Sequence, residues 1–226
     1  ILAEKYDLYV EYSNYADINN KLGIELFIGH KKYNKTVPIN DENYMNYFND
    51  NIKNNANFDF MNAYFQSEEI TTILHNRLTN NMKNIMDKNP YKERYNNNND
   101  IFLHIRLGDT KKYSLGINYF VHCINALQYD NIYIGSDSFN DESIKKLKTL
   151  YPSIIFIDKN PVETIQFGST CKNIILSHGS FSAVIGYLGF FSNVYFMNKD
   201  PEWCPLGMFL NKGFIPIESS RAPQCC

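Results

Sequence analysis

The chain has 226 residues, is 44% hydrophobic and carries a formal net charge of −2 with a pI near 6.2. This length suits one large domain or two small ones with a packed core. The charge balance lacks the basic footprint of nucleic-acid-binding proteins, so we expect no nucleic-acid partner. The most apolar stretch, residues 181–196, is broken by glycines and falls short of the roughly 20 residues of a membrane span.

The first hundred residues have an irregular pattern. We expect the end of a helix at residues 1–6, a strand at 8–12, loops with short helices at 29–57, and an extended segment at 58–65 where aromatic residues alternate. Because the first residue is not Met, we expect that a signal, an anchor or a first strand can precede Ile1. A cytoplasmic location is favoured.

A helix is predicted to begin after Ser67. The serine is a common capping residue, and Glu68 and Glu69 place negative charge in the first turn. Apolar residues then follow at helical spacing as far as Met86. Pro90 and the asparagine run 96–99 predict the end of this helix and a linker. Such abundant asparagine is typical of an AT-rich genome, for example that of a large DNA virus.

The pattern becomes regular from residue 101 onward. Strands are predicted at 101–105, 131–135, 153–157, 172–176 and 193–197, with helices between them. Alternating apolar strands and helices favour an α/β fold with a parallel sheet covered on both faces. We therefore divide the chain into two domains, residues 1–98 and residues 99–226.

Polar residues follow the predicted strands. In open α/β sheets, ligands bind beyond the carboxyl ends of the strands. The residues at those ends are small, polar or charged: Arg106, Ser136, Asp137, Asp158 and the run 177–180.

Arg106 is the strongest candidate among them. Its guanidinium can hold two phosphate oxygens with paired donors and stays charged at any working pH. The competing interpretation is a surface ion pair, for instance with Asp109. Arg106 ends a strand, which favours the functional interpretation.

His104 and Asp109 flank this arginine and leave several roles open. His104 alternates with apolar neighbours, so it is either a satisfied buried histidine or a group that orients Arg106 or the donor sugar. Asp109 could hold Arg106, cap the loop, or accept a proton from an acceptor hydroxyl, which requires hydrogen-bond reach.

A second candidate phosphate site is predicted where Ser180, Phe181 and Ser182 open a helix after His178 and Gly179. Helix N-termini offer backbone N–H groups and the positive end of a dipole. The alternative is an ordinary serine cap. Ser136 and Asp137 could contact a base or ribose, although acidic loop residues are common in such folds.

Metal and other cofactor templates find little support. The sequence has no Asp-x-Asp and no His/Cys cluster with zinc spacing, so we expect no metal site. If a diphosphate departs in the reaction and no metal binds it, arginine and helix N–H groups must neutralise its negative charge. G-x-G-x-x-G, the P-loop and the G-x-S-x-G elbow are also absent. We expect Cys123 and Cys171 to be buried free thiols.

Residues 104–109, His-Ile-Arg-Leu-Gly-Asp, resemble the H-x-R-R-G-D motif of the α-1,2-fucosyltransferases, glycosyltransferase family 11. Residues 62–68 are similar to its G-Y-F-Q-S-E segment, 132–137 to its F-S-D-D strand end, and 177–188 to its N-S-S-F-S-W-W-G-A-Y-L block. Trp203 stands where the family has P-x-W-F. Each motif alone is modest, but their order is fairly specific.

The resemblance implies a GT-B-like fold of two Rossmann-type domains with parallel sheets. Residues 1–98 would be the N-terminal acceptor-side domain, which is incomplete because the family's G-x-x-G-N-Q loop is absent, and residues 99–226 the nucleotide-sugar-binding domain. It implies transfer of L-fucose from GDP-fucose to a glycan hydroxyl, with inversion and without a metal or other cofactor. Arg106 and residues 180–182 would bind the donor phosphates, with His104 and Asp109 beside the fucosyl group. Leu107 replaces the second arginine, and Ala183-Val184 the Trp pair. Another deoxysugar nucleotide donor, or a non-catalytic glycan-binding relative, therefore stays open.

Overall fold

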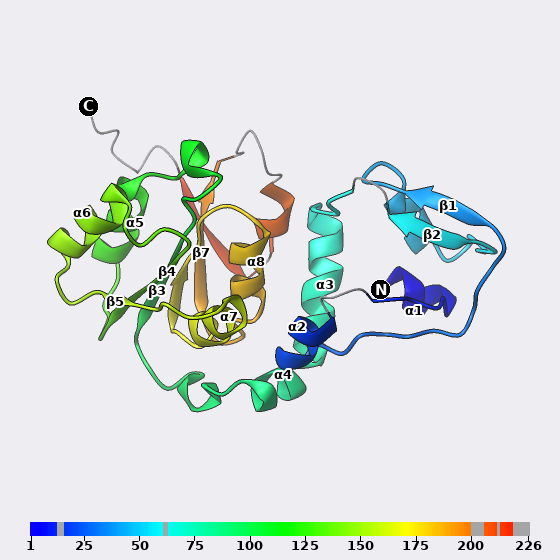
Figure 1. Cartoon of the computed structure of the whole chain (residues 1–226), viewed down its shortest axis with the longest axis horizontal. Helices are drawn as coiled ribbons and strands as arrows, with labels where there is room; N and C mark the ends of the chain where they lie inside the picture. Colours follow the sequence, from blue (N-terminus) through cyan, green and yellow to red (C-terminus); the bar gives the residue numbers. More distant parts are fainter. Residues whose placement is uncertain (13–15, 61–62, 200–205, 212, 219–226) are drawn as a thin grey trace.

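The computed structural model describes residues 1–12, 16–60, 63–199, 206–211 and 213–218. The larger of its two sheets has six parallel strands (Figure 1). The strands are β3 (Ile101–Ile105), β4 (Ile132–Ser136), β5 (Ile155–Phe156), β6 (Asn173–Ile175), β7 (Asn193–Asn198) and β8 (Phe214–Glu218). Their order is β5-β4-β3-β6-β7-β8, and every neighbouring pair is parallel. If the six strands are numbered 1 to 6 in chain order, beginning with β3, this is the order 3-2-1-4-5-6 of doubly wound sheets. The predicted α/β class with parallel sheets is confirmed.

Helices cover both faces of this sheet (Figure 1). α5 (Ile117–Asn125) and α6 (Glu142–Leu150) lie on one face, and α7 (Pro161–Gly168) and α8 (Ser180–Tyr187) on the other. The residues of β3 alternate between the two layers: Ile101, Leu103 and Ile105 pack with α5 and α6, whereas Phe102 packs with α7 and α8. All five residues of β3 are buried, as expected for a central strand.

The helices around the sheet begin at capping residues. The side chain of Asp141 accepts a hydrogen bond from the Ser143 N–H, and that of Asn160 accepts one from the Glu163 N–H. Each cap satisfies a backbone donor that the first turn leaves open. Pro161 follows Asn160 at the first helical position, where its missing N–H costs nothing.

The N-terminal part is smaller and contains a parallel pair of strands, β1 (Thr36–Ile39) and β2 (Asn57–Phe60). Its helices are α1 (Leu2–Tyr6), α2 (Ala16–Lys21), α3 (Glu68–Asn80) and α4 (Met82–Lys88). Figure 1 shows α3 between this pair and the six-stranded sheet. Leu78 of α3 and Ile85 of α4 join the core of the α7–α8 layer. The described part of residues 1–98 thus shows two paired strands where a Rossmann-type sheet was expected.

Several local predictions were wrong. Residues 8–12 form no strand, because Leu8 makes one isolated bridge to Lys31 and no ladder continues from it. The helix after Ser67 is interrupted at Asn81, which separates α3 from α4. The predicted linker at Pro90 and residues 96–99 does connect α4 to β3, and it is packed: the neighbouring Tyr95 is buried, and the Asn98 amide donates to the Thr170 carbonyl at 2.9 Å.

Four short 3-10 helices complete the described elements: η1 (Tyr44–Phe48), η2 (Lys92–Arg94), η3 (Lys111–Tyr113) and η4 (Leu206–Phe209). η4 packs against both α3 and α8.

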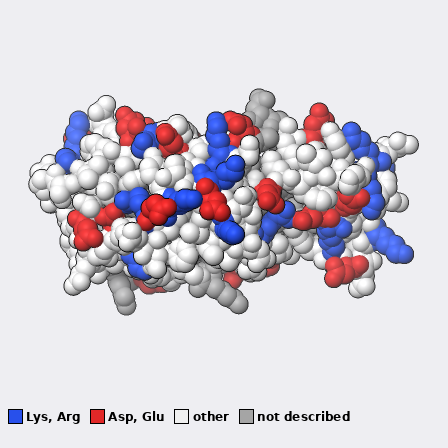
Figure 2. All heavy atoms as spheres, turned by 90° about the horizontal axis from the view of Figure 1, so that it is seen from below, with Lys and Arg blue, Asp and Glu red and all other residues white. Residues whose placement is uncertain are grey.

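Charged side chains of both signs are interspersed on the face seen in Figure 2. This mixture agrees with the small net charge and differs from the single-sign patch of a nucleic-acid-binding surface. Within the described residues, no helix has the length and apolar character needed to cross a membrane.

Candidate functional site

The candidate site lies where the strand order of the sheet reverses, between β3 and β6. From these two neighbouring strands the chain continues to opposite sides of the sheet, so their carboxyl ends form the topological switch point at which such folds bind ligands. The loop after β3 carries Arg106, and the segment after β6 carries Ser177 and leads into α8.

A buried hydrogen-bonded cluster joins the two strand ends. The backbone N–H of Arg106 donates to Ser177 Oγ at 3.2 Å. Ser177 Oγ lies 3.0 Å from Ser182 Oγ and 3.2 Å from His104 Nδ1. His104 Nδ1 lies 2.5 Å from Ser182 Oγ. Three elements, β3, the segment after β6 and α8, thus meet in one polar contact inside the protein.

His104 is a neutral, buried member of this cluster. Only 6% of the residue is exposed, and this burial lowers the pKa of the imidazole from 6.5 to about 4. The Asp137 carboxylate raises the pKa and the Arg106 guanidinium lowers it, both to a smaller extent. A histidine held in this way is uncharged at neutral pH, so it is suited to positioning its neighbours.

Arg106 forms an ion pair with Asp109, which the sequence analysis gave as the competing interpretation of this residue. Its Nη2 lies 3.1 and 3.2 Å from the two carboxylate oxygens of Asp109. The Asp109 side chain is 75% exposed and that of Arg106 is 27% exposed. The pair therefore lies at the protein surface beyond the end of β3, where an incoming anion can compete with Asp109 for the guanidinium.

Asp137 fixes the loop that carries Arg106. Its carboxylate accepts hydrogen bonds from the Leu107 N–H at 2.9 Å and the Gly108 N–H at 3.1 Å. A side chain at Gly108 would be forced against this carboxylate, since a Cβ there would lie 2.9 Å from Asp137 Oδ2. Asp137 thus ties the end of β4 to the loop after β3, and a contact with ribose or base stays a prediction.

The first turn of α8 opens toward the same edge. Gly179 precedes it with a φ of 107°, a conformation that favours glycine, and it provides no side-chain cap for the helix N–H groups. Ser180 is exposed, whereas Ser182 is fully buried. The Phe181 ring lies 5.0 Å from the His104 ring. His178 is buried near Phe209, with 6.3 Å between ring centroids.

The structure therefore brings most of the predicted site residues to one edge and divides them by exposure. Arg106, Asp109, Asp137 and Ser180 are accessible or partly accessible, while His104, His178 and Ser182 are buried. The Ser136 hydroxyl accepts from the Ser138 N–H within its own loop. Trp203 lies outside the described residues.

Two residues gain importance that sequence analysis did not give them. Ser177 links Arg106 to the cluster, although its place at the end of a predicted strand was visible in the sequence. Leu107, which stands where the similar family has a second arginine, is 1% exposed and packs in the core with α5 and α6. This position is thus part of the core in this protein.

No metal ligands gather in the part of the chain that the structure describes, where no group of three or more His, Cys, Asp or Glu side chains has suitable geometry. Cys123 and Cys171 are buried free thiols, as predicted, and burial raises the pKa of each to about 12.

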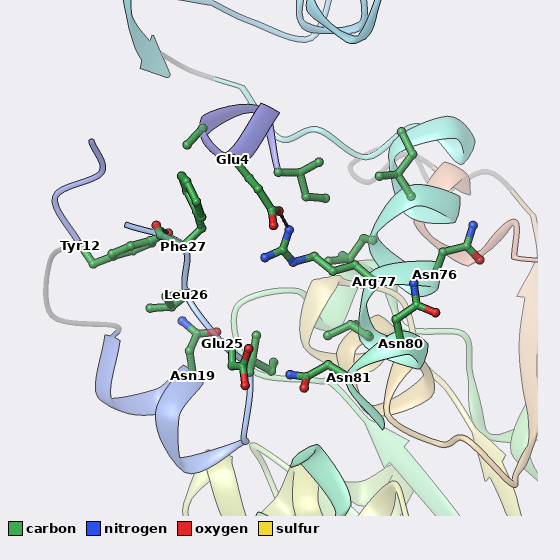
Figure 3. Close-up of a pocket in the computed structure, with 16 residues that line it drawn as sticks. Glu4, Tyr12, Asn19, Glu25, Leu26, Phe27, Asn76, Arg77, Asn80 and Asn81 are labelled. Carbon is green, nitrogen blue, oxygen red and sulfur yellow. Dashed lines mark hydrogen bonds and ion pairs between the residues drawn. The ribbon is translucent and has the colours of Figure 1, made fainter. Parts of the chain in front are cut away.

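A pocket of about 780 Å³ lies elsewhere, in the N-terminal part (Figure 3). It is bordered by α1, α3 and residues 24–27. Glu4 and Arg77 point toward one another across it and form an ion pair. None of the site residues predicted from the sequence lines this pocket.

Comparison with known proteins gives similarity of fold. No family model and no curated protein match the sequence. Two crystal structures of NodZ alpha-1,6-fucosyltransferase do, one soaked with GDP-fucose and the other co-crystallised with GDP. The first has 16% identity and a TM-score of 0.38 over 62% of this chain. The second has 15% identity and a TM-score of 0.40 over 63%.

This chain spans about half of either solved chain, 53% in both comparisons. At this level the similarity concerns the fold alone. The α-1,2 linkage and membership of glycosyltransferase family 11 stay proposals.

Proposed function

We propose that this protein is a glycosyltransferase that transfers L-fucose from GDP-fucose to a hydroxyl of a glycan acceptor. The reaction would proceed with inversion at the sugar carbon and without a metal ion. The proposed membership of glycosyltransferase family 11, the GDP-fucose donor and the α-1,2 linkage rest on the ordered motifs of the sequence. Two of these motifs, residues 104–109 and 177–188, lie at the site described above.

One observation carries the proposal: Arg106 and the start of α8 border the same strand-order reversal and are joined by the Ser177 cluster. A departing nucleoside diphosphate carries negative charge that must be stabilised. A guanidinium supplies paired donors for phosphate oxygens, and a helix N-terminus supplies N–H groups and a positive dipole end. Held in place before the reaction, such donors lower the barrier most effectively.

The remaining roles follow from exposure. Ser180 and Phe181 are open to the donor, whereas Ser182 and His104 support them from inside. Asp109 is the candidate general base for the acceptor hydroxyl, because it is the exposed carboxylate next to Arg106. In the free protein it pairs with Arg106, and binding of the diphosphate would release it.

Calorimetry with EDTA present tests this proposal directly. We expect GDP and GDP-fucose to bind, and UDP and ADP to bind at least about tenfold more weakly, which corresponds to about 1.4 kcal/mol. A preference for UDP would overturn the choice of donor. Absence of binding by all four nucleotides would overturn the proposal as a whole.

The core position of Leu107 favours a second candidate within the same fold, an enzyme with another deoxysugar nucleotide or a relative that binds glycans without catalysis. With leucine in place of this arginine, one positive charge fewer is available to stabilise the departing diphosphate. Release of free nucleotide from a panel of sugar nucleotides distinguishes these cases: turnover with another donor supports the first, and binding without turnover supports the second.

A further inference from the structure

The polar cluster between β3 and α8 has a definite count of donors and acceptors. A serine hydroxyl has one hydrogen to donate and two lone pairs, and a neutral imidazole has one N–H and one acceptor nitrogen. The Arg106 N–H already donates to Ser177 Oγ. The remaining contacts are Ser177 to Ser182, Ser182 to His104 and the longer one from Ser177 to His104, and they share two hydroxyl hydrogens and one ring nitrogen.

One arrangement gives both serine hydroxyl hydrogens an acceptor within the cluster. The Arg106 N–H donates to Ser177 Oγ, the Ser177 hydroxyl donates to Ser182 Oγ, and the Ser182 hydroxyl donates to His104 Nδ1. The ring proton of His104 is then on Nε2. If Nδ1 carried the proton instead, it would be a donor to the serines, and the contact between Ser177 and Ser182 could use only one of their two hydroxyl hydrogens. The other hydroxyl hydrogen would have no acceptor within the cluster. Because buried polar hydrogens are satisfied in folded proteins, the first arrangement is favoured.

We propose that Ser177 is a positioning residue that fixes the Nε2–H tautomer of His104 and holds the Arg106 loop in register with the first turn of α8. Its hydroxyl is the middle link of a one-directional chain from the β3 loop to the helix. Hydrogen bonds in such a chain polarise one another, so loss of the middle link weakens both ends. The consequence for donor affinity rests on the proposed function, but the tautomer and the backbone link do not.

Burial and geometry separate Ser177 from a residue that contacts substrate. It is 5% exposed, and its hydroxyl contacts the Arg106 backbone, Ser182 and His104. The low pKa of His104 agrees with this arrangement, because a protonated ring would turn Nδ1 from an acceptor into a donor and break the chain.

Nitrogen-15 NMR of the histidine rings at pH 7, together with amide hydrogen exchange, tests the proposal without any ligand. In the parent protein we expect a non-protonated Nδ1 and a protonated Nε2 for His104, and slow exchange of the Arg106 amide. A protonated Nδ1 in the parent overturns the proposal, and no variant is needed for that result.

Variants test the link itself. Ser177→Ala should raise the exchange rate of the Arg106 amide at least tenfold, and Ser177→Thr, which keeps the hydroxyl, should restore most of the protection. Ser169→Ala is the matched control, since Ser169 is an equally buried serine whose hydroxyl donates to the Gln166 carbonyl at the opposite edge of the sheet. A folded Ser177→Ala protein with parental exchange and tautomer would overturn the proposal.

GDP affinity then connects the link to the proposed function. Ser177→Ala should weaken GDP binding about tenfold, while Ser169→Ala should leave it unchanged. If the parent binds no nucleotide, the proposed function fails while the tautomer and exchange results still decide the role of Ser177. If the parent binds GDP and Ser177→Ala binds it equally well, the positioning role is refuted.

Discussion

His104 Nδ1 lies 2.5 Å from Ser182 Oγ although 78 positions separate the two residues in the chain. The contact joins the central strand β3 to the first turn of α8 in the interior of the protein. It gives Ser182 a supporting role, in contrast to the exposed Ser180 two positions earlier.

Replacement of Ser182 by alanine should therefore destabilise the fold. The substitution leaves a buried acceptor on His104 without its closest partner, which costs about 1–3 kcal/mol. Urea unfolding followed by circular dichroism measures the change. Ser180→Ala, in the same helical turn but exposed, should change stability by less than about 0.5 kcal/mol. Equal effects of the two substitutions would contradict the importance of the buried contact.

Gly186 should be intolerant of even a methyl group. A Cβ at this position would lie 2.6 Å from the Phe214 ring and 3.0 Å from Val194 Cγ1, which shows how closely α8 approaches the sheet. Gly186→Ala should cost about 1–3 kcal/mol through overpacking, measured by thermal unfolding. At Gly213 a Cβ would meet nothing within 4 Å, so Gly213→Ala is the control and should leave the melting temperature nearly unchanged.

The sequence predicted the sheet best where strands are buried on both faces. Residues 101–105 match β3 at both ends, because a short, mostly apolar run bounded by Asp100 and Arg106 is typical of a buried strand. β8 was missed, since Pro216 weakens its strand pattern, and the structure places it at the edge of the sheet, where a proline is tolerated. β1 was also missed, because it pairs with one strand only and its residues lie within a polar segment.

The sequence predicted candidate site residues but not the hydrogen bonds between them. Arg106 and Ser180 were predicted because ligands bind beyond the carboxyl ends of strands in such sheets. The bonds of Ser177 to Arg106 and to His104 depend on the register between β3 and β6, which pairs Leu103 with Ile175. No local pattern specifies that register, and so the division of the serines into exposed and supporting ones required the three-dimensional structure.

The buried His104 should make the protein sensitive to acid. Its pKa is about 4 in the folded protein against 6.5 for an unperturbed histidine, so between these values the unfolded chain binds a proton that the folded chain does not. Stability from this residue is complete above pH 6.5 and falls as the pH drops toward 4, by up to about 3 kcal/mol.

His104→Gln removes the titrating imidazole but keeps an acceptor for Ser182. The variant therefore isolates the pH-dependent contribution of His104 to stability. The variant is expected to be less stable than the parent at pH 7, and the difference should shrink as the pH falls to 4. Urea unfolding at several pH values measures it. A difference that stays constant with pH would show that His104 is not held neutral by the fold.

Arg106 should be the most sensitive position for catalysis. Arg106→Ala removes the paired donors for the leaving diphosphate, and turnover should fall by a factor on the order of 10²–10³, as when a preorganised oxyanion donor is lost. Arg106→Lys keeps the charge but not the paired donors of the planar guanidinium, so it should recover only part of the activity. Release of GDP from GDP-fucose is the measurement, with unfolding curves as a check on the fold. Activity of the alanine variant within a few-fold of the parent would exclude Arg106 from the phosphate site.

Asp109 has two possible roles that one substitution can separate. Asp109→Asn removes the charge that pairs with Arg106 while it keeps the size of the side chain. If Asp109 activates the acceptor hydroxyl, turnover should fall by a factor on the order of 10²–10⁴ with GDP affinity maintained or improved, because the guanidinium is no longer paired. Transfer rates and calorimetry on the same preparation provide both values.

The control for this experiment is Asp130→Asn, an exposed carboxylate just before β4, at the opposite edge of the sheet. It should leave both turnover and GDP affinity at the parental level. We expect the large loss of turnover for Asp109→Asn, since Asp109 is an exposed carboxylate held next to Arg106. Turnover within a few-fold of the parent, accompanied by tighter GDP binding, would instead assign Asp109 the sole task of holding Arg106 until the donor arrives.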